Sequence, residues 1–290
     1  MSATGAGEMG IVRAARRPAG WIAPGPRPDT ALRTDLVPAA GEDLCFLAGD
    51  YRIFQRRDGH RWSADDLITA HFAIRTALGA GAAPRRIVDL GCGIGTVLLF
   101  LAWRFPEAEV TGIEAQAISY GLAERSLAWN GLSGRCAVRH GDLREAEVRQ
   151  GLSGAELVTG TPPYLPVGSG PESRRVQCGP CRFEHRGGIE EYCLAAGEIL
   201  APGGRFVACA AGFQRGRVEK AAAGAGLCLS AWMDVFPKPG KPPLFGVFSM
   251  QREGVPAVRE ETALYLRGPN DRFTVEHDLV RHALGIPVAA

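Results

Sequence analysis

The sequence predicts an α/β fold with a seven-stranded, mostly parallel sheet, helices on both faces and a small N-terminal β-hairpin extension. From Pro84 onward, short apolar segments with the length of buried strands alternate with stretches of helical periodicity. A glycine-rich turn follows the first of these apolar segments. Strands and helices that alternate at this length form parallel sheets through right-handed crossovers, which predicts the fold class.

Three regions are expected along the 290 residues. Residues 1–42 are rich in Arg, Pro and Gly without apolar periodicity, so we expect a flexible leader there. Residues 43–255 are expected to form one globular domain, because 46% of the chain is hydrophobic and its Gly and Pro are spread out rather than repeated. Residues 256–290 form a C-terminal extension in which we find no motif.

The expected elements begin with the hairpin. Between Cys45 and Trp62, short apolar clusters alternate with turn signals, which is typical of a β-hairpin. Ser63 is expected to cap a helix, because apolar residues recur at helical spacing from Leu67 to Leu78. Strands then follow at 86–90, 109–113, 136–139, 156–160, 205–210, 227–235 and 245–251, with helices that end near residues 105, 129 and 200.

Bulk composition excludes some classes of protein but does not select a substrate. The net charge of +2 is too small to indicate a polyanionic partner by itself. No apolar run approaches the roughly 20 residues that span a bilayer, so we expect no membrane association. We therefore expect a soluble, cytoplasmic protein. An organellar targeting segment is the alternative, because residues 1–34 are rich in arginine and poor in acidic residues.

The cysteines indicate free thiols. There are eight of them without a secretory signal, which is typical of a protein from a reducing compartment. Cys178 and Cys181, in the sequence Cys-Gly-Pro-Cys, have the spacing of a redox motif or of half a zinc site. No second close pair and no His-x-x-x-His segment completes four ligands, so we expect no metal.

Glycines and acidic residues follow the first three predicted strands of the sheet. The first strand leads into Asp-x-Gly-x-Gly-x-Gly over residues 89–95, Glu114 ends the second, and Asp142 follows the third. Ligands of open α/β sheets bind beyond the carboxyl ends of the strands, where the strand order reverses. Glycine there lets a ligand approach the backbone, while Glu114 is placed for ribose hydroxyls and Asp142 for an adenine amine. The candidate cofactor-binding residues are Asp89, Gly91, Gly93, Gly95, Glu114 and Asp142.

A dinucleotide-dependent dehydrogenase is the alternative, because its fingerprint also combines a glycine-rich turn with a later acidic residue. Its Gly-x-Gly-x-x-Gly motif delivers a pyrophosphate to the amino terminus of a helix. In this chain Asp89 lies two residues before the first glycine. A carboxylate at that place repels a pyrophosphate but tolerates a cofactor with an ammonium and a sulfonium group.

The tetrapeptide Thr161-Pro162-Pro163-Tyr164 ends the fourth predicted strand and supplies the candidate catalytic residues. The lone pair of an exocyclic or amide nitrogen is delocalised, so that nitrogen is a poor nucleophile. Acceptors aimed at its hydrogens localise the pair, and a polar first residue and the Pro162 carbonyl can supply them. The prolines hold the turn rigid, and Tyr164 is placed to stack on a target ring.

Together these motifs resemble class I S-adenosylmethionine-dependent methyltransferases over roughly residues 63–252. The resemblance implies a Rossmann-like sheet, S-adenosyl-L-methionine as the cofactor and methyl transfer as the reaction. The tetrapeptide resembles the Asn/Asp/Ser-Pro-Pro-Tyr/Phe motif of members that methylate exocyclic amines of bases or the side-chain amide of glutamine. Thr161 departs from that motif, because its hydroxyl accepts a hydrogen bond but lacks the geometry of an amide or carboxylate.

The segment before the sheet resembles the lead-in of bacterial tRNA adenine-N6 methyltransferases that modify a valine tRNA beside its anticodon. It has Phe-Gln at residues 54–55 and Gly-x-Arg-x-Ser-x-Asp over residues 59–65, and Arg182 and Glu184 continue the match. In that family the aspartate lies near the mouth of the cofactor site. The resemblance therefore adds Asp65 to the candidate cofactor-binding residues.

The expected function is methyl transfer to a planar nitrogen, adenine N6 in RNA first of all, with tRNA as the partner. The alternatives are a protein-glutamine or small-molecule methyltransferase, and a non-catalytic RNA- or partner-binding module in which Thr161 marks a lost site. In-line transfer needs alignment more than a base, so His185 is a solvated residue or, alternatively, a general base. The loop after the tetrapeptide contains arginines that either contact phosphates or form a solvated surface, namely Arg174, Arg175, Arg182 and Arg186.

Overall fold

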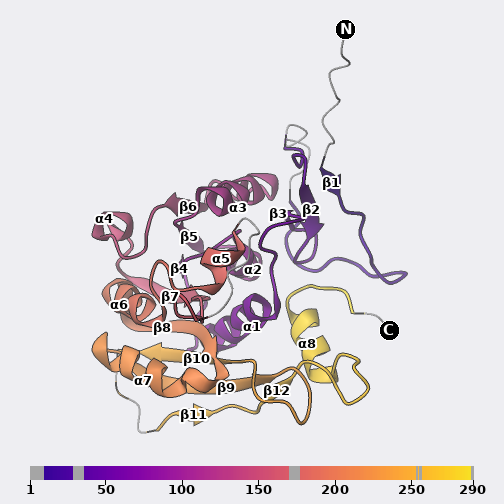
Figure 1. Ribbon diagram of the computed structural model, residues 1–290. Coiled ribbons are helices and arrows are strands. Elements are labelled where there is room, and N and C mark those ends of the chain that lie inside the picture. The colour runs from indigo at the N-terminus through magenta and orange to yellow at the C-terminus, as the bar shows by residue number, and fades with distance from the viewer. Residues whose placement is uncertain (1–9, 29–35, 170–176, 253, 255–256, 289–290) are drawn as a thin grey trace.

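The computed structural model describes residues 10–28, 36–169, 177–252, 254 and 257–288 (Figure 1). The predicted hairpin is present as the antiparallel pair β2 (Glu42–Phe46) and β3 (Arg52–Arg56). A two-residue strand, β1 (Ile11–Val12), adds to β2 in parallel and completes a three-stranded sheet. No helix within the described ranges is both long and apolar enough to cross a bilayer.

The central sheet contains all seven predicted strands. They are β4 (Arg86–Leu90), β5 (Glu109–Glu114), β6 (Cys136–His140), β7 (Ala155–Gly160), β8 (Leu200–Ala211), β9 (Cys228–Phe236) and β10 (Phe245–Gln251). Two short strands of the C-terminal extension, β11 (Arg259–Glu260) and β12 (Leu264–Tyr265), pair with β9. The sheet order is β11-β9-β10-β8-β7-β4-β5-β6, and only β10 runs antiparallel to its neighbours. The expected Rossmann-like, mostly parallel sheet is confirmed.

The strand order reverses at β4. The chain passes outward from β4 to β5 and β6, then returns to the other side of β4 to form β7 and β8. Registers such as Asp89 opposite Thr159 and Leu90 opposite Ile113 bring the carboxyl ends of β4, β5 and β7 to one edge. A crevice opens at such a reversal because the connecting helices leave toward opposite faces of the sheet.

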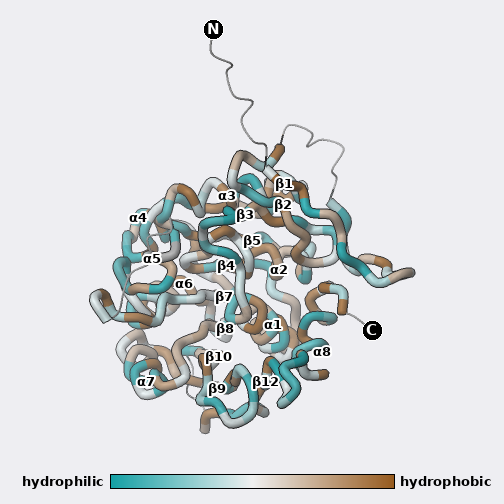
Figure 2. Tube along the Cα trace, turned by 45° about the vertical axis from the view of Figure 1, so that its right-hand side comes forward, coloured by the Kyte–Doolittle hydropathy of each residue, from teal (hydrophilic) through white to brown (hydrophobic). Residues whose placement is uncertain are grey.

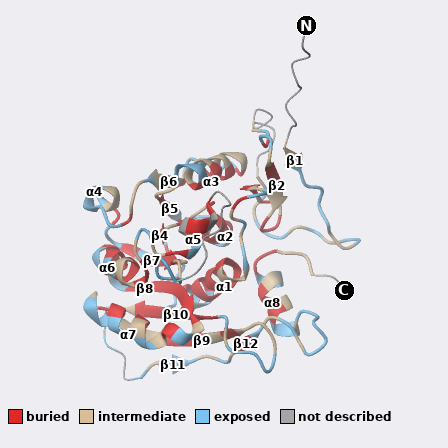
Figure 3. Ribbon diagram, viewed as in Figure 1, coloured by how far each residue is buried: buried red, intermediate tan, exposed pale blue. Residues whose placement is uncertain are grey.

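Helices cover both faces of the sheet (Figure 1). The helices are α1 (Ala64–Gly79), α2 (Thr96–Arg104), α3 (Ala117–Trp129), α4 (Ala146–Arg149), α5 (Cys178–Arg182), α6 (Ile189–Ile199), α7 (Arg215–Gly224) and α8 (Val275–Ala283). Side chains of α1, α2 and α3 pack in one buried cluster, and those of α6 and α7 pack in another. Successive strand residues alternate between the clusters, since Leu157 belongs to the first and Val158 to the second. Figure 3 shows the resulting buried sheet between helices with exposed outer faces.

Ser63 begins α1 as predicted, and its cap also shapes the site. Ser63 is in an extended conformation, and its backbone N–H donates to the carboxylate of Asp66 at 3.0 Å. This reciprocal capping box satisfies amide groups that the first turn of a helix leaves without partners. Both Asp65 and Asp66 lie in that first turn, where the helix dipole favours negative charge.

Residues 10–28 of the expected flexible leader contact the hairpin. The guanidinium of Arg13 pairs with the buried carboxylate of Asp43 at 2.7 Å, and that of Arg17 pairs with Asp50 at 2.7 Å. The Arg17 guanidinium also stacks on the ring of Phe46, 4.5 Å from its centroid. These contacts link the segment to residues about 30 positions away, which composition alone does not reveal. Residues 1–9 and 29–35 lie outside the described part of the chain.

Candidate active site

A cavity of about 910 Å³, counted with the space open to solvent at its mouth, lies at the carboxyl edge of the sheet. Its walls are the turns that follow β4, β5, β6 and β7, together with the start of α1 and the loop before α6. The structure brings nine of the predicted site residues to this cavity: Asp65, Gly91, Gly93, Glu114, Asp142, Thr161, Pro162, Pro163 and Tyr164. Two predicted residues, Asp89 and Gly95, are not part of the lining.

The glycine turn after β4 gives the cavity its floor. Gly93 has φ +56°, and no atom lies within 4 Å of the place where a Cβ would stand. That open space adjoins the cavity, so a ligand can approach the backbone there. Gly91 has φ +59°, and a Cβ on it would collide with the hydroxyl of Tyr192. Gly95, with φ +87°, instead forms the start of α2 and packs against Ala123.

Glu114 is buried, and two backbone amides hold its carboxylate. The N–H of Gly93 donates to Oε2 at 2.9 Å, and the N–H of Gln116 donates to Oε1 at 2.6 Å. Burial raises the pKa of Glu114, and these two hydrogen bonds oppose that rise. The glycine turn and the end of β5 are thereby joined, and the orientation of the carboxylate is fixed.

Asp142, after β6, is held by Arg144. The backbone N–H and the guanidinium of Arg144 donate to both carboxylate oxygens, with distances of 2.7 to 3.0 Å. Burial acts to raise the pKa of Asp142, but the hydrogen bonds and charge of Arg144 outweigh it and hold the pKa below its usual value. Asp142 is therefore an ionised acceptor at the wall of the cavity.

Asp89 lies behind the glycine turn instead of in the cavity wall. Its residue is 2% exposed, and the hydroxyl of Thr159 on β7 donates to Oδ1 at 2.7 Å. Oδ2 is buried without a hydrogen-bond partner in the described structure. Burial raises the pKa of Asp89 to about 7, and the nearby charge of Glu114 contributes to that rise. The side chain of Asp89 is thus set back from the cavity lining, and its expected role in cofactor binding stays a prediction.

Four polar side chains meet where α1 begins and β7 ends. The hydroxyl of Ser63 donates to Oδ1 of Asp65, and the hydroxyl of Thr161 hydrogen-bonds with the carboxyl group of Asp66. Burial and the charge of Asp65 raise the pKa of Asp66 well above its ordinary value. Thr161 is therefore part of a polar cluster at the cavity wall, and its hydroxyl has a fixed partner.

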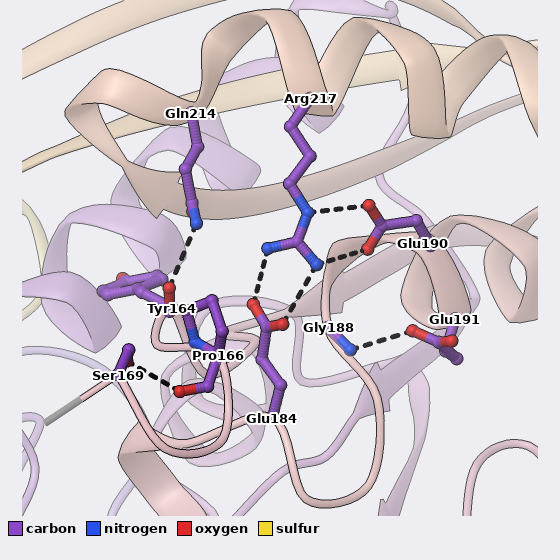
Figure 4. Close-up of polar contacts among 9 residues, drawn as sticks. All are labelled: Tyr164, Pro166, Ser169, Glu184, Gly188, Glu190, Glu191, Gln214 and Arg217. Carbon is purple, nitrogen blue, oxygen red and sulfur yellow. Dashed lines mark hydrogen bonds and ion pairs between the residues drawn. The ribbon is translucent and has the colours of Figure 1, made fainter.

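The side chain of Tyr164 is anchored through its hydroxyl. The hydroxyl donates to Oδ2 of Asp65 at 3.2 Å and lies 2.9 Å from Sγ of Cys209. Its carbonyl oxygen accepts a hydrogen bond of 3.0 Å from the amide of Gln214, a residue that immediately precedes α7 (Figure 4). With the hydroxyl engaged inside the protein, the ring is the part of Tyr164 that can contact a substrate.

The loop after the tetrapeptide is tied to the helices beneath it. The guanidinium of Arg217 on α7 makes two hydrogen bonds to Glu184 and two to Glu190, with distances of 2.6 to 3.0 Å (Figure 4). Bidentate pairs of this kind are directional as well as strong. The loop and the amino terminus of α6 are thereby held in one arrangement beside the cavity.

Sequence reasoning missed several residues of the lining, among them His60, Asp66 and Tyr192, and it considered Arg186 only as a phosphate contact or a solvated residue. Asp66 had a signal, because an acidic residue three positions after Ser63 completes a capping box. The guanidinium of Arg186 adds positive charge near Glu114 and Asp142 and helps to lower the pKa of both. Burial lowers the pKa of His60, which favours a neutral ring.

Several other expectations fall outside the cavity or outside the described residues. Arg182 and His185 are exposed and are not part of the lining. Arg174, Arg175 and the side chain of Cys178 lie outside the described residues. Within the described ranges, no group of three or more His, Cys, Asp or Glu side chains could hold a metal ion.

Comparison with known proteins agrees with this geometry. Residues 87–159, which run from β4 to β7, match the family model described as a methyltransferase domain. The match supports a class I S-adenosylmethionine-dependent methyltransferase domain in this part of the chain. The glycine turn, Glu114 and Asp142 all lie within the matched part of this methyltransferase domain.

Two curated relatives are similar to this chain over more residues than the family model matches. The tRNA1(Val) (adenine(37)-N6)-methyltransferase of Porphyromonas gingivalis is 31% identical over 130 residues, which is 44% of this chain and 50% of the relative. The release factor glutamine methyltransferase of Bordetella pertussis is 33% identical over 174 residues, which is 57% of this chain and 60% of the relative. The chain thus spans half the length of the first relative and three fifths of the second.

A solved structure supports the fold of the methyltransferase domain. A predicted O-methyltransferase from Agrobacterium tumefaciens superposes with a TM-score of 0.57 at 20% identity, covering 78% of this chain and 99% of that one. At this identity the likeness concerns the fold alone. The superposition supports the α/β fold described above.

Proposed function

We propose that the chain transfers a methyl group from S-adenosylmethionine to a planar nitrogen, with adenine N6 in a tRNA as the acceptor. The observation that carries this proposal is that Thr161-Pro162-Pro163-Tyr164 lines the same cavity as Glu114 and Asp142. An acceptor held by the tetrapeptide would then lie beside the cofactor. The similarity to a tRNA adenine-N6 methyltransferase over 130 residues supports RNA as the substrate.

The residues of the cavity fit S-adenosylmethionine in shape and charge. The free space beside Gly93 accepts a ligand against the backbone, and Oδ2 of Asp89 is a buried oxygen without a partner in the described structure. A positive ligand nearby would stabilise the ionised form of Asp89. In our assignment Glu114 holds the ribose hydroxyls and Asp142 the adenine amine. The acidic residues of the lining outnumber its one arginine, Arg186; they are Asp65, Asp66, Glu114 and Asp142.

When bound, S-adenosylmethionine supplies an electrophilic methyl group on a sulfonium. The contribution of the chain is to align the acceptor nitrogen with that methyl group, and alignment can lower a barrier by about 7–11 kcal/mol. The ring of Tyr164, anchored through its hydroxyl, provides a rigid surface on which a base stacks.

Thr161 and Asp66 have different roles at the acceptor nitrogen: Thr161 accepts a hydrogen bond from it, and Asp66 takes its proton. Because the Thr161 hydroxyl hydrogen-bonds with Asp66, its lone pairs and the Pro162 carbonyl remain to accept the amine hydrogens. With S-adenosylmethionine bound, the acceptor nitrogen would receive the methyl group and would then have a proton to release. Burial raises the pKa of Asp66, so its carboxylate is suited to take that proton.

The test uses labelled S-adenosylmethionine with an unmodified tRNA transcript and with a release factor, followed by digestion to nucleosides and amino acids. We expect label in N6-methyladenosine. Thr161→Val removes the hydroxyl at constant shape and should lower kcat by on the order of 100-fold, whereas the matched variant Thr161→Ser should retain most activity. Label in neither substrate, or equal activity of the two variants, would contradict the proposal.

Methylation of a glutamine side chain in a protein is the second candidate. The observation that favours it is the similarity to a release factor glutamine methyltransferase, which extends over 174 residues. A side-chain amide presents the same delocalised nitrogen to Thr161 and Pro162. Label recovered as N5-methylglutamine, with none in tRNA, would select this function.

A further inference from the structure

A second depression, which we call the arginine groove, lies beside the active-site cavity. Its volume is about 1590 Å³, counted with the space open to solvent. Three parts of the chain line it: residues 11–17, parts of the hairpin region between residues 45 and 62, and residues 281–287. The lining contains five arginines and no acidic residue; the arginines are Arg13, Arg16, Arg17, Arg61 and Arg281.

The acidic groups nearest the groove do not neutralise it. Asp43, whose side chain is 1% exposed, pairs with Arg13 at 2.7 Å and with Arg61 at 3.3 Å. One buried carboxylate thus lies between two guanidinium groups. Asp50 pairs with Arg17 at 2.7 Å, and Asp278 pairs with Arg281 at 3.1 Å, which leaves five lining arginines against three carboxylates. The positive charge of these arginines exceeds the negative charge beneath them, and their exposed edges face the groove.

Aromatic rings fix the planes of the guanidinium groups. Those of Arg17 and Arg52 lie 4.5 and 3.8 Å from the ring centroid of Phe46. A guanidinium that stacks on a ring keeps N–H groups at its edge for phosphate oxygens. Arg52 itself is not part of the groove lining; burial and, to a lesser extent, the positive charge of Arg17 lower its pKa. Phe46 and Trp62 are themselves part of the groove lining.

Hydrogen bonds join the walls of the groove. The N–H of Gly49 donates to the carbonyl of Gly285 at 2.9 Å, which ties the hairpin to the C-terminal segment. The N–H of Arg13 donates to the carbonyl of Leu44 at 3.0 Å and ties the N-terminal segment to β2. In Figure 1 and Figure 2 the three-stranded sheet and the C-terminal segment lie on the same side of the molecule. The arginines are therefore held in place before any partner binds.

The groove and the cavity share a stretch of chain but differ in charge. His60 and Asp65 line the cavity, whereas Arg61 and Trp62, which lie between them in sequence, line the groove. Adjacent Cα atoms are about 3.8 Å apart, so the two depressions border each other. Four of the charged side chains in the cavity lining are acidic and one is an arginine, so the cavity would repel a phosphate, while the groove would attract one.

We infer that the arginine groove binds the phosphate backbone of an RNA whose target base enters the neighbouring cavity. The identity of that base rests on the proposed function, but the groove itself is argued from its own charge and aromatic lining. A neutral base can enter an acidic cavity while its charged backbone stays outside it, and arginine contacts to phosphates position RNA without reading its sequence.

The test measures binding of a fluorescein-labelled, unmodified tRNA transcript by anisotropy from 50 to 300 mM salt. Arg16→Gln combined with Arg61→Gln removes two exposed groove charges, and Asp43 keeps Arg13 as its partner. We expect about tenfold weaker binding at low salt and a log–log salt slope that is smaller by about 2. The matched control is Arg85→Gln combined with Arg86→Gln, two exposed arginines where β4 begins, at the opposite edge of the sheet.

The outcomes separate this inference from the proposed function. Weaker tRNA binding by the groove variant alone supports the groove, even if the parent protein methylates no RNA. Equal loss in both double variants, or no change in either, would refute a groove that binds RNA. Unchanged tRNA binding together with weaker binding of an acidic protein would also refute it. S-adenosylmethionine affinity should be the same in the parent and the groove variant.

Discussion

Asp89→Asn should change how the stability of the protein depends on pH. The carboxyl group of Asp89 is buried, accepts one hydrogen bond from Thr159 and leaves Oδ2 without a partner in the described structure. Burial raises its pKa from the ordinary 3.8 to about 7. Asparagine has the same shape and can keep the Thr159 hydrogen bond, but it does not titrate.

The sign follows from proton binding in the two states. Between pH 4 and pH 7 the folded parent holds a proton on Asp89 that the unfolded chain has released, so the free energy of unfolding falls as pH rises. Each pKa unit corresponds to about 1.4 kcal/mol. Between pH 5 and pH 8 the titration of Asp89 therefore lowers the free energy of unfolding of the parent by about 3 kcal/mol. The asparagine variant has no such titration and does not show this decrease.

Urea unfolding followed by tryptophan fluorescence at pH 5 and pH 8 measures the effect. We expect the free energy of unfolding of the variant, relative to the parent, to be about 3 kcal/mol higher at pH 8 than at pH 5. Asp142→Asn is the control without a pH effect in this range: Arg144 holds the pKa of Asp142 below its usual value, so this carboxyl group is ionised at both pH values and the loss of stability in the variant should be the same at pH 5 and pH 8. A difference between the Asp89→Asn variant and the parent that is the same at both pH values would refute the argument.

Two further predictions concern the glycine turn and the loop after the tetrapeptide. Gly93→Ala places a methyl group in the open space beside the cavity, so we expect calorimetry to show at least about tenfold weaker S-adenosylmethionine binding. The positive φ of residue 93 should also cost the variant about 1–2 kcal/mol of folding stability through backbone strain. Gly151→Ala, with φ +75° and the same free space outside the cavity, is the matched control, and equal binding by both variants would contradict the prediction. Arg217→Gln leaves Glu184 and Glu190 without their shared partner, so thermal unfolding at pH 7 should show that the free energy of unfolding is lower by about 1–3 kcal/mol. The loss is not larger because Glu190 is partly exposed to solvent. Since Arg217 lowers the pKa of Glu190, that loss should shrink as pH falls through this pKa, and a loss independent of pH would count against the ion pair.

The central sheet could be predicted from the sequence strand by strand. Residues 86–90 and the helix over 117–129 match the structure at both ends, because long apolar runs and helical periodicity are strong local signals. The strands β11 and β12 have two residues each, which is too short for any periodicity, and they exist only because β9 offers a free edge. The placement of residues 10–28 depends on ion pairs between residues 30 or more positions apart, such as Arg13 with Asp43, which no local pattern reveals.

The sequence indicated which residues follow a strand and therefore lie at the cavity. It did not indicate how the side chains of residues within a strand are oriented. Glu114 and Asp142 lie at strand ends, and topology alone brings such ends together. Asp89 belongs to β4 itself, and the sequence does not say that its carboxyl turns to Thr159 on the neighbouring strand. Asp66 was missed because the motif points to Asp65, although the two adjacent carboxyls both reach the cavity.

Calorimetric titration of the parent protein and of Glu114→Gln with S-adenosylmethionine tests the central claim most directly. Glu114 is buried, and both of its oxygens accept backbone N–H groups, so an amide in its place turns one acceptor into a donor facing a donor. We predict one binding site in the parent and a loss of about 1–3 kcal/mol of binding free energy in the variant. No binding by the parent, or equal affinity in both proteins, would contradict the assignment of this cavity to the cofactor.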